Sequence, residues 1–277
     1  MKTHRIELFG IPFDVVNTHH ALLKLHYYSQ VSLGEQYFCV TPNPEMIVYA
    51  SKHPAFFRIL KDADFSLPDG TGILWASGFL PPLELQKLSS SRRKKMWKIF
   101  LDGVRSLWQF TFDRKNFRGR IFARITGTDM FGDFLATSQA KIFLLGGAPL
   151  SAKTLAENFP NIVGYYDGKV TSEKSAAILE HIKNSDARVL FVALGSPKQE
   201  MWISEHLSKI PNIRFAMGVG GAFDFIAGKR KRAPFWMQRA GLEWLFRLLR
   251  EPKRIVRIFR ATVSFFFLAL RERQKLL

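Results

Sequence analysis

Short apolar or β-branched runs alternate along the chain with longer stretches whose apolar positions recur at helical spacing. Four runs predict buried strands: residues 36–40, 141–145, 189–194 and 215–218. Four stretches predict helices: residues 43–60, 151–159, 172–184 and 198–210. Such alternation is typical of an α/β protein, so we expect a Rossmann-like fold with a largely parallel sheet and flanking helices.

Two segments interrupt this alternation. Residues 79–122 include the pair Pro81-Pro82 near their start and look inserted into the sheet domain. After Gly228 the pattern becomes helical and basic. We therefore predict an α/β domain over residues 1–228 that contains the insertion, and a helical C-terminal appendage over residues 229–277.

The positive charge of the chain is concentrated in those two segments. The whole chain has a formal net charge of +18. Residues 79–124 hold twelve Lys and Arg against three Asp and Glu, and residues 229–277 hold fourteen against three, which leaves −2 on the remainder. A near-neutral body with two basic segments is expected to attract polyanions, either nucleic-acid phosphates or acidic lipid headgroups.

The apolar residues among these charges favour a lipid surface. In the insertion, six of them share one helical face: Trp97, Phe100, Leu101, Val104, Leu107 and Trp108. In the appendage, the run 261–270 is too short to span a bilayer, which needs about 20 apolar residues. An aromatic face with a basic border is typical of a helix in the headgroup plane. Each stripe alone fits a core helix equally well, but two basic stripes together favour the membrane.

The remaining composition narrows the chemistry. Cys39 is the single cysteine and stands in an apolar run, which excludes an internal disulfide and indicates a small buried side chain. His19 and His20 lack a partner cluster and are expected at the surface. The N-terminal residues lack the apolar core of a secretory signal, so we expect a cytoplasmic protein. P-loop, His-Glu-x-x-His and Gly-x-Ser-x-Gly patterns are absent from the sequence. Their absence counts against a P-loop NTPase, a metalloprotease of that type and a serine hydrolase.

Turn sequences follow the predicted strands, and ligands of open α/β sheets bind beyond the carboxyl ends of the strands. The turns are Thr41-Pro-Asn43, Gly146-Gly-Ala-Pro149, Gly195-Ser-Pro197 and Gly218-Val-Gly-Gly221. The last resembles a dinucleotide-binding turn, but Phe223 stands where the third glycine belongs. A glycine turn lets backbone N–H groups approach a phosphate, although chain reversal alone explains it equally well.

A more specific signal comes from an ordered set of segments. They are Thr41-Pro-Asn-Pro-Glu45, Pro68-Asp-Gly-Thr-Gly72, Arg124-Ile-Thr-Gly-Thr-Asp129, Tyr166-Asp-Gly168, Gly195-Ser-Pro-Lys-Gln-Glu200, Gly218-Val-Gly-Gly-Ala-Phe-Asp224, Arg232-Ala-Pro234 and residues 241–254. In this order they resemble the WecG/TagA/CpsF family of bacterial glycosyltransferases, glycosyltransferase family 26. The resemblance covers nearly the whole chain apart from the insertion and the last residues.

The resemblance implies an inverting glycosyltransferase that needs neither a cofactor nor a metal. The implied donor is a UDP-sugar that carries N-acetylmannosamine, its uronic acid, glucuronic acid or a related hexose. The implied acceptor is a polyprenyl-diphosphate-linked saccharide in cell-surface polysaccharide synthesis. An enzyme with such an acceptor is expected as a peripheral protein on the cytoplasmic face of the bacterial inner membrane, with an acidic membrane surface as a partner. The oligomeric state stays open.

The resemblance also assigns residues. Asp69 matches the proposed general base, and two polar residues join it in the catalytic set: Gln199 and Thr41. An arginine near the diphosphate matches Arg124. Arginines of the appendage that close over the site match Arg247, Arg254 and Arg257. The other expected substrate-binding residues are Asn43, Gly195, Ser196, Pro197, Glu200, Gly220 and Gly221.

Elementary chemistry supports these roles. Inversion by single displacement needs one carboxylate to take the proton of the attacking hydroxyl, and Asp69 on a glycine turn is accessible, although a turn-capping Asp is the alternative. Arginine forks suit the phosphate oxygens of a leaving UDP. Four arginines recur three or four residues apart on one helical face: Arg247, Arg250, Arg254 and Arg257.

The insertion departs from the family pattern, because a typical member has a much shorter connection between Asp69 and Arg124. We hypothesise that its amphipathic helix lies beside the acceptor entrance and helps hold the enzyme on the membrane. The main alternative function is a basic nucleic-acid-binding protein, which leaves the turn motifs unexplained. A nicotinamide-dependent oxidoreductase is disfavoured by the incomplete glycine pattern.

Overall fold

A six-stranded parallel sheet is the centre of the computed structural model, which describes residues 3–32, 34–81, 96–113, 115–230, 233–234, 237, 243–250, 252 and 255–276. The strand order is β4-β3-β8-β7-β5-β6, and all neighbours pair in parallel. In chain order the strands are β3 (Tyr37–Val40), β4 (Phe65–Ser66), β5 (Ile142–Gly146), β6 (Ile162–Tyr166), β7 (Val189–Ala193) and β8 (Phe215–Gly218). The expected Rossmann-like α/β fold is confirmed.

Four strands are the predicted ones, each with ends within one residue of the prediction: β3, β5, β7 and β8. Every residue of β5, β7 and β8 is buried, because helices cover both faces of the sheet, and this burial produces the continuous apolar runs. β4 has only two residues. β6 is an edge strand with partly exposed residues. Neither β4 nor β6 therefore forms a clear apolar run in the sequence.

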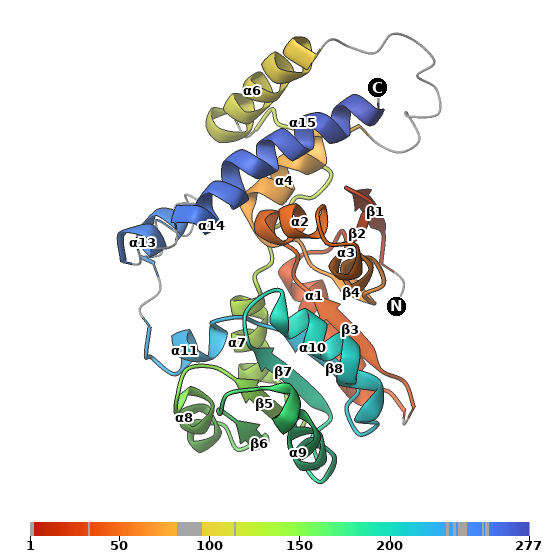
Figure 1. Cartoon of the computed structure of the whole chain (residues 1–277), viewed down its shortest axis with the longest axis vertical. Coiled ribbons are helices and arrows are strands. Elements are labelled where there is room, and N and C mark those ends of the chain that lie inside the picture. The colour runs from red at the N-terminus through yellow and green to blue at the C-terminus, as the bar shows by residue number, and fades with distance from the viewer. Residues whose placement is uncertain are drawn as a thin grey trace.

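The helices flank the sheet in two layers (Figure 1). The helices on one face are α1 (Thr18–Gln30), α7 (Gly127–Thr137), α8 (Ser151–Asn158) and α11 (Ala222–Ile226). Those on the other face are α9 (Ser172–Lys183) and α10 (Lys198–His206), which continues as the 3-10 turn η1 (Leu207–Lys209). Alternate strand residues serve the two layers: Leu144 and Phe191 face the first, and Leu145 and Val192 the second.

The prediction of one helix over residues 43–60 was wrong. Two helices occupy this stretch, α2 (Pro44–Ala50) and α3 (Pro54–Lys61). Pro54 begins the second helix, and the residue before a proline is disfavoured in helical conformation, so the chain breaks at His53. The predicted helix over 198–210 also ends earlier, because α10 stops at His206 and tightens into η1.

A second core lies beyond the β4 edge of the sheet. It unites a hairpin of β1 (Arg5–Leu8) and β2 (Ile11–Asp14) with α2, α3, α4 (Thr71–Phe79), α6 (Met96–Phe112) and α15 (Phe265–Leu276). α13 (Glu243–Arg250) precedes α15 in the chain, and α14 (Ile255–Phe259) and the π-helical turn η3 (Arg260–Ser264) run directly into α15. Figure 1 shows α6 and α15 side by side above α4. The last helix of the chain therefore shares a core with the helix that follows Asp69.

The segment after α6 returns along α4. The Arg120 guanidinium donates from Nε to the main-chain oxygen of Ser77 at 2.9 Å, and the Ile121 N–H donates to the Ser77 hydroxyl at 3.0 Å. Gly78 provides room for this return, because a Cβ there would lie 2.6 Å from the Phe117 ring. The described end of the insertion is thereby packed on the body of the protein.

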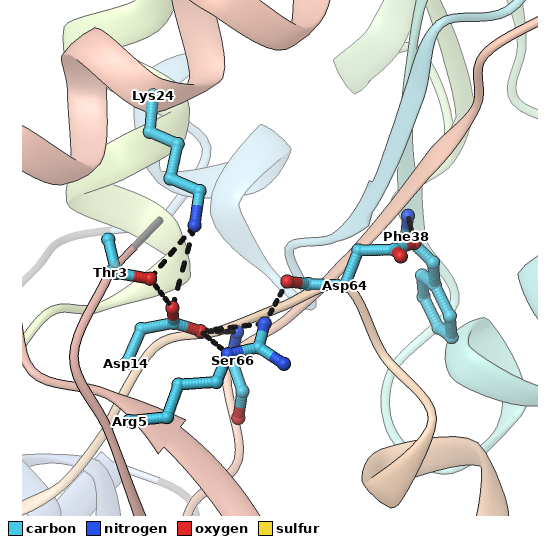
Figure 2. A network of polar contacts seen from close by, with 7 residues as sticks. All are labelled: Thr3, Arg5, Asp14, Lys24, Phe38, Asp64 and Ser66. Carbon is cyan, nitrogen blue, oxygen red and sulfur yellow. Dashed lines mark hydrogen bonds and ion pairs between the residues drawn. The ribbon is translucent and has the colours of Figure 1, made fainter. Parts of the chain in front are cut away.

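A buried carboxylate joins the hairpin to the sheet (Figure 2). Asp14 has no exposed surface, and its Oδ2 accepts the Ser66 N–H at 2.9 Å and the Arg5 Nε–H at 3.1 Å. The Lys24 ammonium lies 3.5 Å from Oδ1, and the Thr3 hydroxyl also donates to it. Burial lowers the pKa of Lys24, and Asp14 opposes that shift. The network fixes Ser66, the last residue of β4, just before the turn that carries the predicted base.

Three smaller expectations can be compared with the structure. Cys39 is fully buried as predicted, and this burial raises the pKa of its thiol. His19 and His20 are exposed. No helix in the described ranges combines the length and apolarity needed to cross a bilayer.

Replacing Asp14 with Asn is expected to destabilise the protein by about 3 kcal/mol, because Lys24 then stays buried without its counter-charge. Urea unfolding followed by circular dichroism measures the change. Asp186→Asn is the matched control, since its pair with Lys141, 2.7 Å apart, is exposed and should barely move the midpoint. Equal midpoints for both variants would contradict the role of Asp14.

Candidate active site

The predicted site residues lie on turns at the carboxyl edge of the parallel sheet. Thr41 and Asn43 follow β3, Asp69 follows β4, Gly195 follows β7, and Gly220 follows β8. Because parallel strands end at the same edge, these turns are neighbours there. The topology therefore gathers residues that are up to about 180 positions apart in the chain.

Backbone hydrogen bonds join the first of these turns. The Asp69 N–H donates to the Pro42 oxygen at 3.1 Å, and the Ile125 N–H donates to the Pro68 oxygen at 2.9 Å. The segment that contains Arg124 thus lies against the Asp69 turn, although more than fifty residues separate them in the chain. The half-buried Arg124 adjoins the same turn.

Gly127 closes the same cluster from the start of α7. A Cβ there would lie 3.4 Å from the Thr41 hydroxyl oxygen and 3.6 Å from the main-chain oxygen of Gly218. Thr41 is 7% exposed, and its hydroxyl lies next to Gly127. The structure thereby brings together the motifs after β3, β4 and β8.

Asp69 is half-buried on a turn that glycine makes possible. Gly70 has a φ of +93°, and a Cβ there would lie 3.0 Å from Cδ of Pro44. Gly70, not Asp69, is the N-cap residue of α4. Asp69 therefore directly precedes the helix start.

Asn43 caps a helix within the site. Its Oδ1 accepts the Met46 N–H at 3.0 Å, so the side-chain oxygen is used at the start of α2. The same turn ends at Glu45, in the first turn of α2.

Gln199 links the turns after β7 and β8. Its side-chain oxygen accepts the N–H of Gly195 at 3.2 Å and that of Gly220 at 2.9 Å, and the residue is 4% exposed. A Cβ on Gly218 would lie 2.5 Å from Gln199 Nε2, which explains the glycine at that position. Gln199 is therefore a buried brace for both turns.

Glu200 is a buried carboxyl beside this brace. It is 1% exposed, and its Oε1 accepts from Gln199 Nε2 at 2.8 Å. Burial raises the pKa of Glu200, while hydrogen bonds from Gln199 and Ser196 oppose the shift. Within the described part of the chain, Oε2 has no hydrogen-bond partner. The Ser196–Pro197 peptide bond in the same turn is cis.

Two aspartates from the motif segments hold the turn after β5, a role that the sequence interpretation missed. Asp224 accepts from the Ala148 N–H at 3.0 Å and the Ser151 hydroxyl at 2.9 Å. Asp167 accepts from the Leu150 N–H at 3.1 Å. Their position after strands was visible in the sequence, but their partners lie between β5 and the start of α8, at least 17 residues away.

The C-terminal helices lie against this site. Nε of Arg257 is 3.0 Å from Oε1 of Glu45 and 3.1 Å from its Oε2. Farther along, Phe265 packs on Gly72, where a Cβ would lie 3.3 Å from the Phe265 ring. The described part of the appendage thus contacts α2 at Glu45 and α4 at Gly72.

The structure describes the other predicted arginines of the appendage only in part. Arg254 and the Arg247 side chain are not among the described parts of the chain, so their expected roles stay predictions. Arg250 lies over the Phe246 ring, with 5.1 Å between its guanidinium carbon and the ring centre. Of the appendage arginines in the predicted set, Arg257 is the one that the structure places at a site motif.

Two hollows in the protein surface lie away from these turns. One of about 460 Å³ is lined by residues that include His26, Thr137 and Arg188, at the amino ends of the strands. Another of about 540 Å³ is lined by residues that include Arg58 and Leu207. Ligands of such sheets bind at the carboxyl ends, so the turn cluster remains the candidate site.

Comparison with known proteins assigns the family. The model of the glycosyl transferase WecG/TagA/CpsF family matches residues 6–92 and 92–276. The chain belongs to this family. The predicted membership is confirmed, and the protein is a glycosyltransferase, which disfavours the nucleic-acid-binding alternative. The two matched segments meet at residue 92, inside the predicted insertion.

Two curated relatives are similar over nearly the full length of this glycosyltransferase. Both are named N-acetylglucosaminyldiphosphoundecaprenol N-acetyl-beta-D-mannosaminyltransferase and come from Staphylococcus aureus, strains MW2 and NCTC 8325 / PS 47. Each is 26% identical over 281 residues, which covers 99% of this chain and 95% of the relative.

The Gln199 brace can be tested with a pair of glycine variants. Gly218→Ala is expected to displace Gln199 and lower the free energy of unfolding by about 2 kcal/mol. Gly221→Ala is the control, because Gly221 has a φ of −81° and its nearest neighbour would be 3.7 Å from the new Cβ. Chemical unfolding of the two variants in parallel measures the difference, and similar losses would argue against the brace.

Glu200 predicts a pH dependence of stability. Burial raises its folded pKa above the ordinary value of 4.5, so the folded state holds the proton more tightly and loses stability as the pH rises through that region. Glu200→Gln removes this loss. The stability of the variant relative to the unmodified protein should therefore increase from about pH 4.5 upward until the raised pKa is passed. Urea midpoints measured across pH 4–8 check this; a constant difference is the opposing result.

Proposed function

We propose that the protein transfers a sugar, with inversion, from a UDP-sugar to a polyprenyl-diphosphate-linked saccharide, and that Asp69 is the general base. The observation that carries this proposal is the position of Asp69. It lies at the carboxyl edge of the sheet, hydrogen-bonded through its backbone to the Thr41-Pro42-Asn43 turn and joined to the Arg124 segment through Pro68. A carboxylate and an arginine thus belong to neighbouring segments. The carboxylate can take the proton of an acceptor hydroxyl, and the arginine can bind a diphosphate.

The relatives support a specific chemistry for both substrates. The name of these relatives includes an N-acetylmannosaminyl group as the sugar transferred and N-acetylglucosaminyldiphosphoundecaprenol as the acceptor. We take the same kind of acceptor for this chain, with N-acetylmannosamine, its uronic acid, glucuronic acid or a related hexose as the transferred sugar. The proposed process is the synthesis of a cell-surface polysaccharide.

The catalytic and donor-binding roles follow from position. Asp69 takes the proton of the acceptor hydroxyl as that oxygen attacks the anomeric carbon, and the bond from this carbon to the UDP oxygen breaks. Gln199 acts by holding its two turns, because its amide oxygen is already bonded to Gly195 and Gly220. Gly195 and Gly220 then contribute the shape of the backbone at the site, because their N–H groups already donate hydrogen bonds to Gln199.

The leaving diphosphate needs positive charge, and two described arginines supply it. Arg124 adjoins the Asp69 turn. Arg257 is half exposed and paired with Glu45, and an exposed ion pair of this kind is worth little, so it can exchange for a phosphate oxygen. The proposed donor site also includes Ser196, Pro197 and Gly221. We keep Arg247 and Arg254 in the same role, and no cofactor or metal is part of the proposal.

The acceptor determines where the enzyme works. A polyprenyl chain lies in the bilayer, so the diphosphate and the saccharide are presented at the membrane surface. We propose that residues 229–277 act as a membrane-associating appendage of the domain 1–228. The protein is then peripheral on the cytoplasmic face of the bacterial inner membrane, where acidic lipids attract its basic segments.

Asp69→Asn is expected to lower the transfer rate at least about a hundredfold, because the amide cannot accept the proton. UDP binding should persist, since the change leaves the arginines in place. A radiolabelled UDP-sugar panel with a short-chain polyprenyl-diphosphate acceptor measures transfer, and calorimetry measures UDP binding. Asp62→Asn, at the exposed end of α3, is the control. Near-normal transfer by Asp69→Asn would exclude the base assignment.

A further inference from the structure

α6 presents an apolar outer face that the described part of the protein leaves exposed. Four of its residues are spaced four, three and four apart, and therefore lie on one side of the helix. Their exposed fractions are 57% for Trp97, 54% for Leu101, 46% for Val104 and 60% for Trp108. Phe112, at the end of the helix, is 75% exposed. We call these five residues the outer face.

The opposite side of α6 is fixed to the body. Ile99 is fully buried, and a Cβ on Gly103 would lie 2.7 Å from the Leu270 side chain, so α6 and α15 are in close contact there. The Trp75 indole N–H donates to the Ser106 hydroxyl at 3.2 Å. With this side held by α4 and α15, the outer face cannot turn inward without breaking that packing.

Basic residues border the outer face. Lys98 and Arg105 are exposed on the side of α6 next to it, and Lys115 and Arg118 follow the helix at the surface. Asp102 faces the other way, with its Oδ2 3.8 Å from an Arg273 nitrogen. The described border is therefore positive, which complements an acidic surface.

These properties select a lipid surface over a protein partner. Tryptophan is enriched at the headgroup level of membranes, and a helix with Trp and Leu on one face and Lys and Arg beside it is typical of interfacial binding. The 17 residues of α6 extend about 25 Å, and the helix is held on α15 at Gly103 and on α4 at Ser106, so it would lie on a bilayer rather than enter it.

The neighbouring C-terminal helices add to this surface. Exposed apolar residues recur along them at intervals of three or four positions: Val256, Phe259, Val263 and Phe267. Their fractions lie between 39% and 56%. α15 contacts α6 directly, so these exposed apolar residues lie on helices next to α6 or continuous with its neighbour.

We propose that the outer face of α6 binds the headgroup region of an acidic bilayer and sets the position of the active site relative to it. This inference rests on the proposed function, because the lipid-linked acceptor provides the reason for such an orientation. The structural link is short. Trp75 of α4 bonds to Ser106 of α6, and α4 begins two residues after Asp69. Asp69, α4 and α6 thus behave as one rigid unit above the lipid.

The test combines two variants in one chain, Trp97→Ser and Trp108→Ser. Flotation with vesicles of phosphatidylglycerol and phosphatidylcholine should show binding at least about tenfold weaker, since two aromatic side chains no longer enter the interface. Leu23→Ser with Tyr27→Ser on α1 is the matched control, because these residues are similarly exposed, at 43% and 47%. Thermal unfolding should be unchanged in both, which separates lost binding from lost folding.

A second readout separates this inference from the proposed function. The tryptophan variant should keep its transfer to a short-chain, water-soluble acceptor and lose at least about tenfold in transfer to a long-chain acceptor in vesicles. If the unmodified protein transfers sugar to neither acceptor, the proposed function fails while flotation still tests α6.

Unchanged flotation of the tryptophan variant would overturn the inference. So would a change from dimer to monomer in light scattering with unchanged flotation, because the face would then be a contact between two copies of the chain. Equal binding of the unmodified protein to vesicles of phosphatidylcholine alone would remove the role of acidic lipid.

Discussion

The form of the candidate site depends on one side-chain amide. Gln199 accepts from the N–H groups of Gly195 and Gly220, which belong to turns after adjacent strands, and it requires a glycine at position 218. Without this brace, two loops that contain glycines with positive φ would have many accessible conformations. A buried amide with its partners satisfied gives them a single arrangement, at which a substrate can be bound without further ordering.

The sheet could be predicted because its central strands are buried on both faces. β5, β7 and β8 therefore appear as continuous apolar runs. β4 could not, because two residues carry no periodicity and its place is fixed by Asp14 and Asp64, whose carboxylates accept the Ser66 and Phe38 N–H groups. These contacts join segments that are tens of residues apart. α4 is buried on nearly all sides, so its sequence lacks an amphipathic pattern.

The motifs of the site were recognisable in the sequence, but the role of each polar residue in them was not. Polar residues on turns look alike whether they face a ligand or brace another turn. Asn43 caps α2, and Asp224 holds the turn after β5. The role of Asp224 depends on a partner 76 residues away, which no local pattern identifies. The exposed side of α6 was a pattern of the opposite kind, because helical spacing alone placed Trp97 and Trp108 on one face.

The crossing at Gly103 has a consequence for the order in which the protein is made. α6 is translated early, and its inner side packs on Leu270, some 167 residues later in the chain. At about 5–20 residues per second, roughly ten to thirty seconds pass before that partner exists. During this time the inner side of α6 lacks the cover that α15 provides. The nascent chain therefore contains the membrane-binding face of α6 before it contains a complete enzyme. Once α15 is made, it covers the inner side of α6.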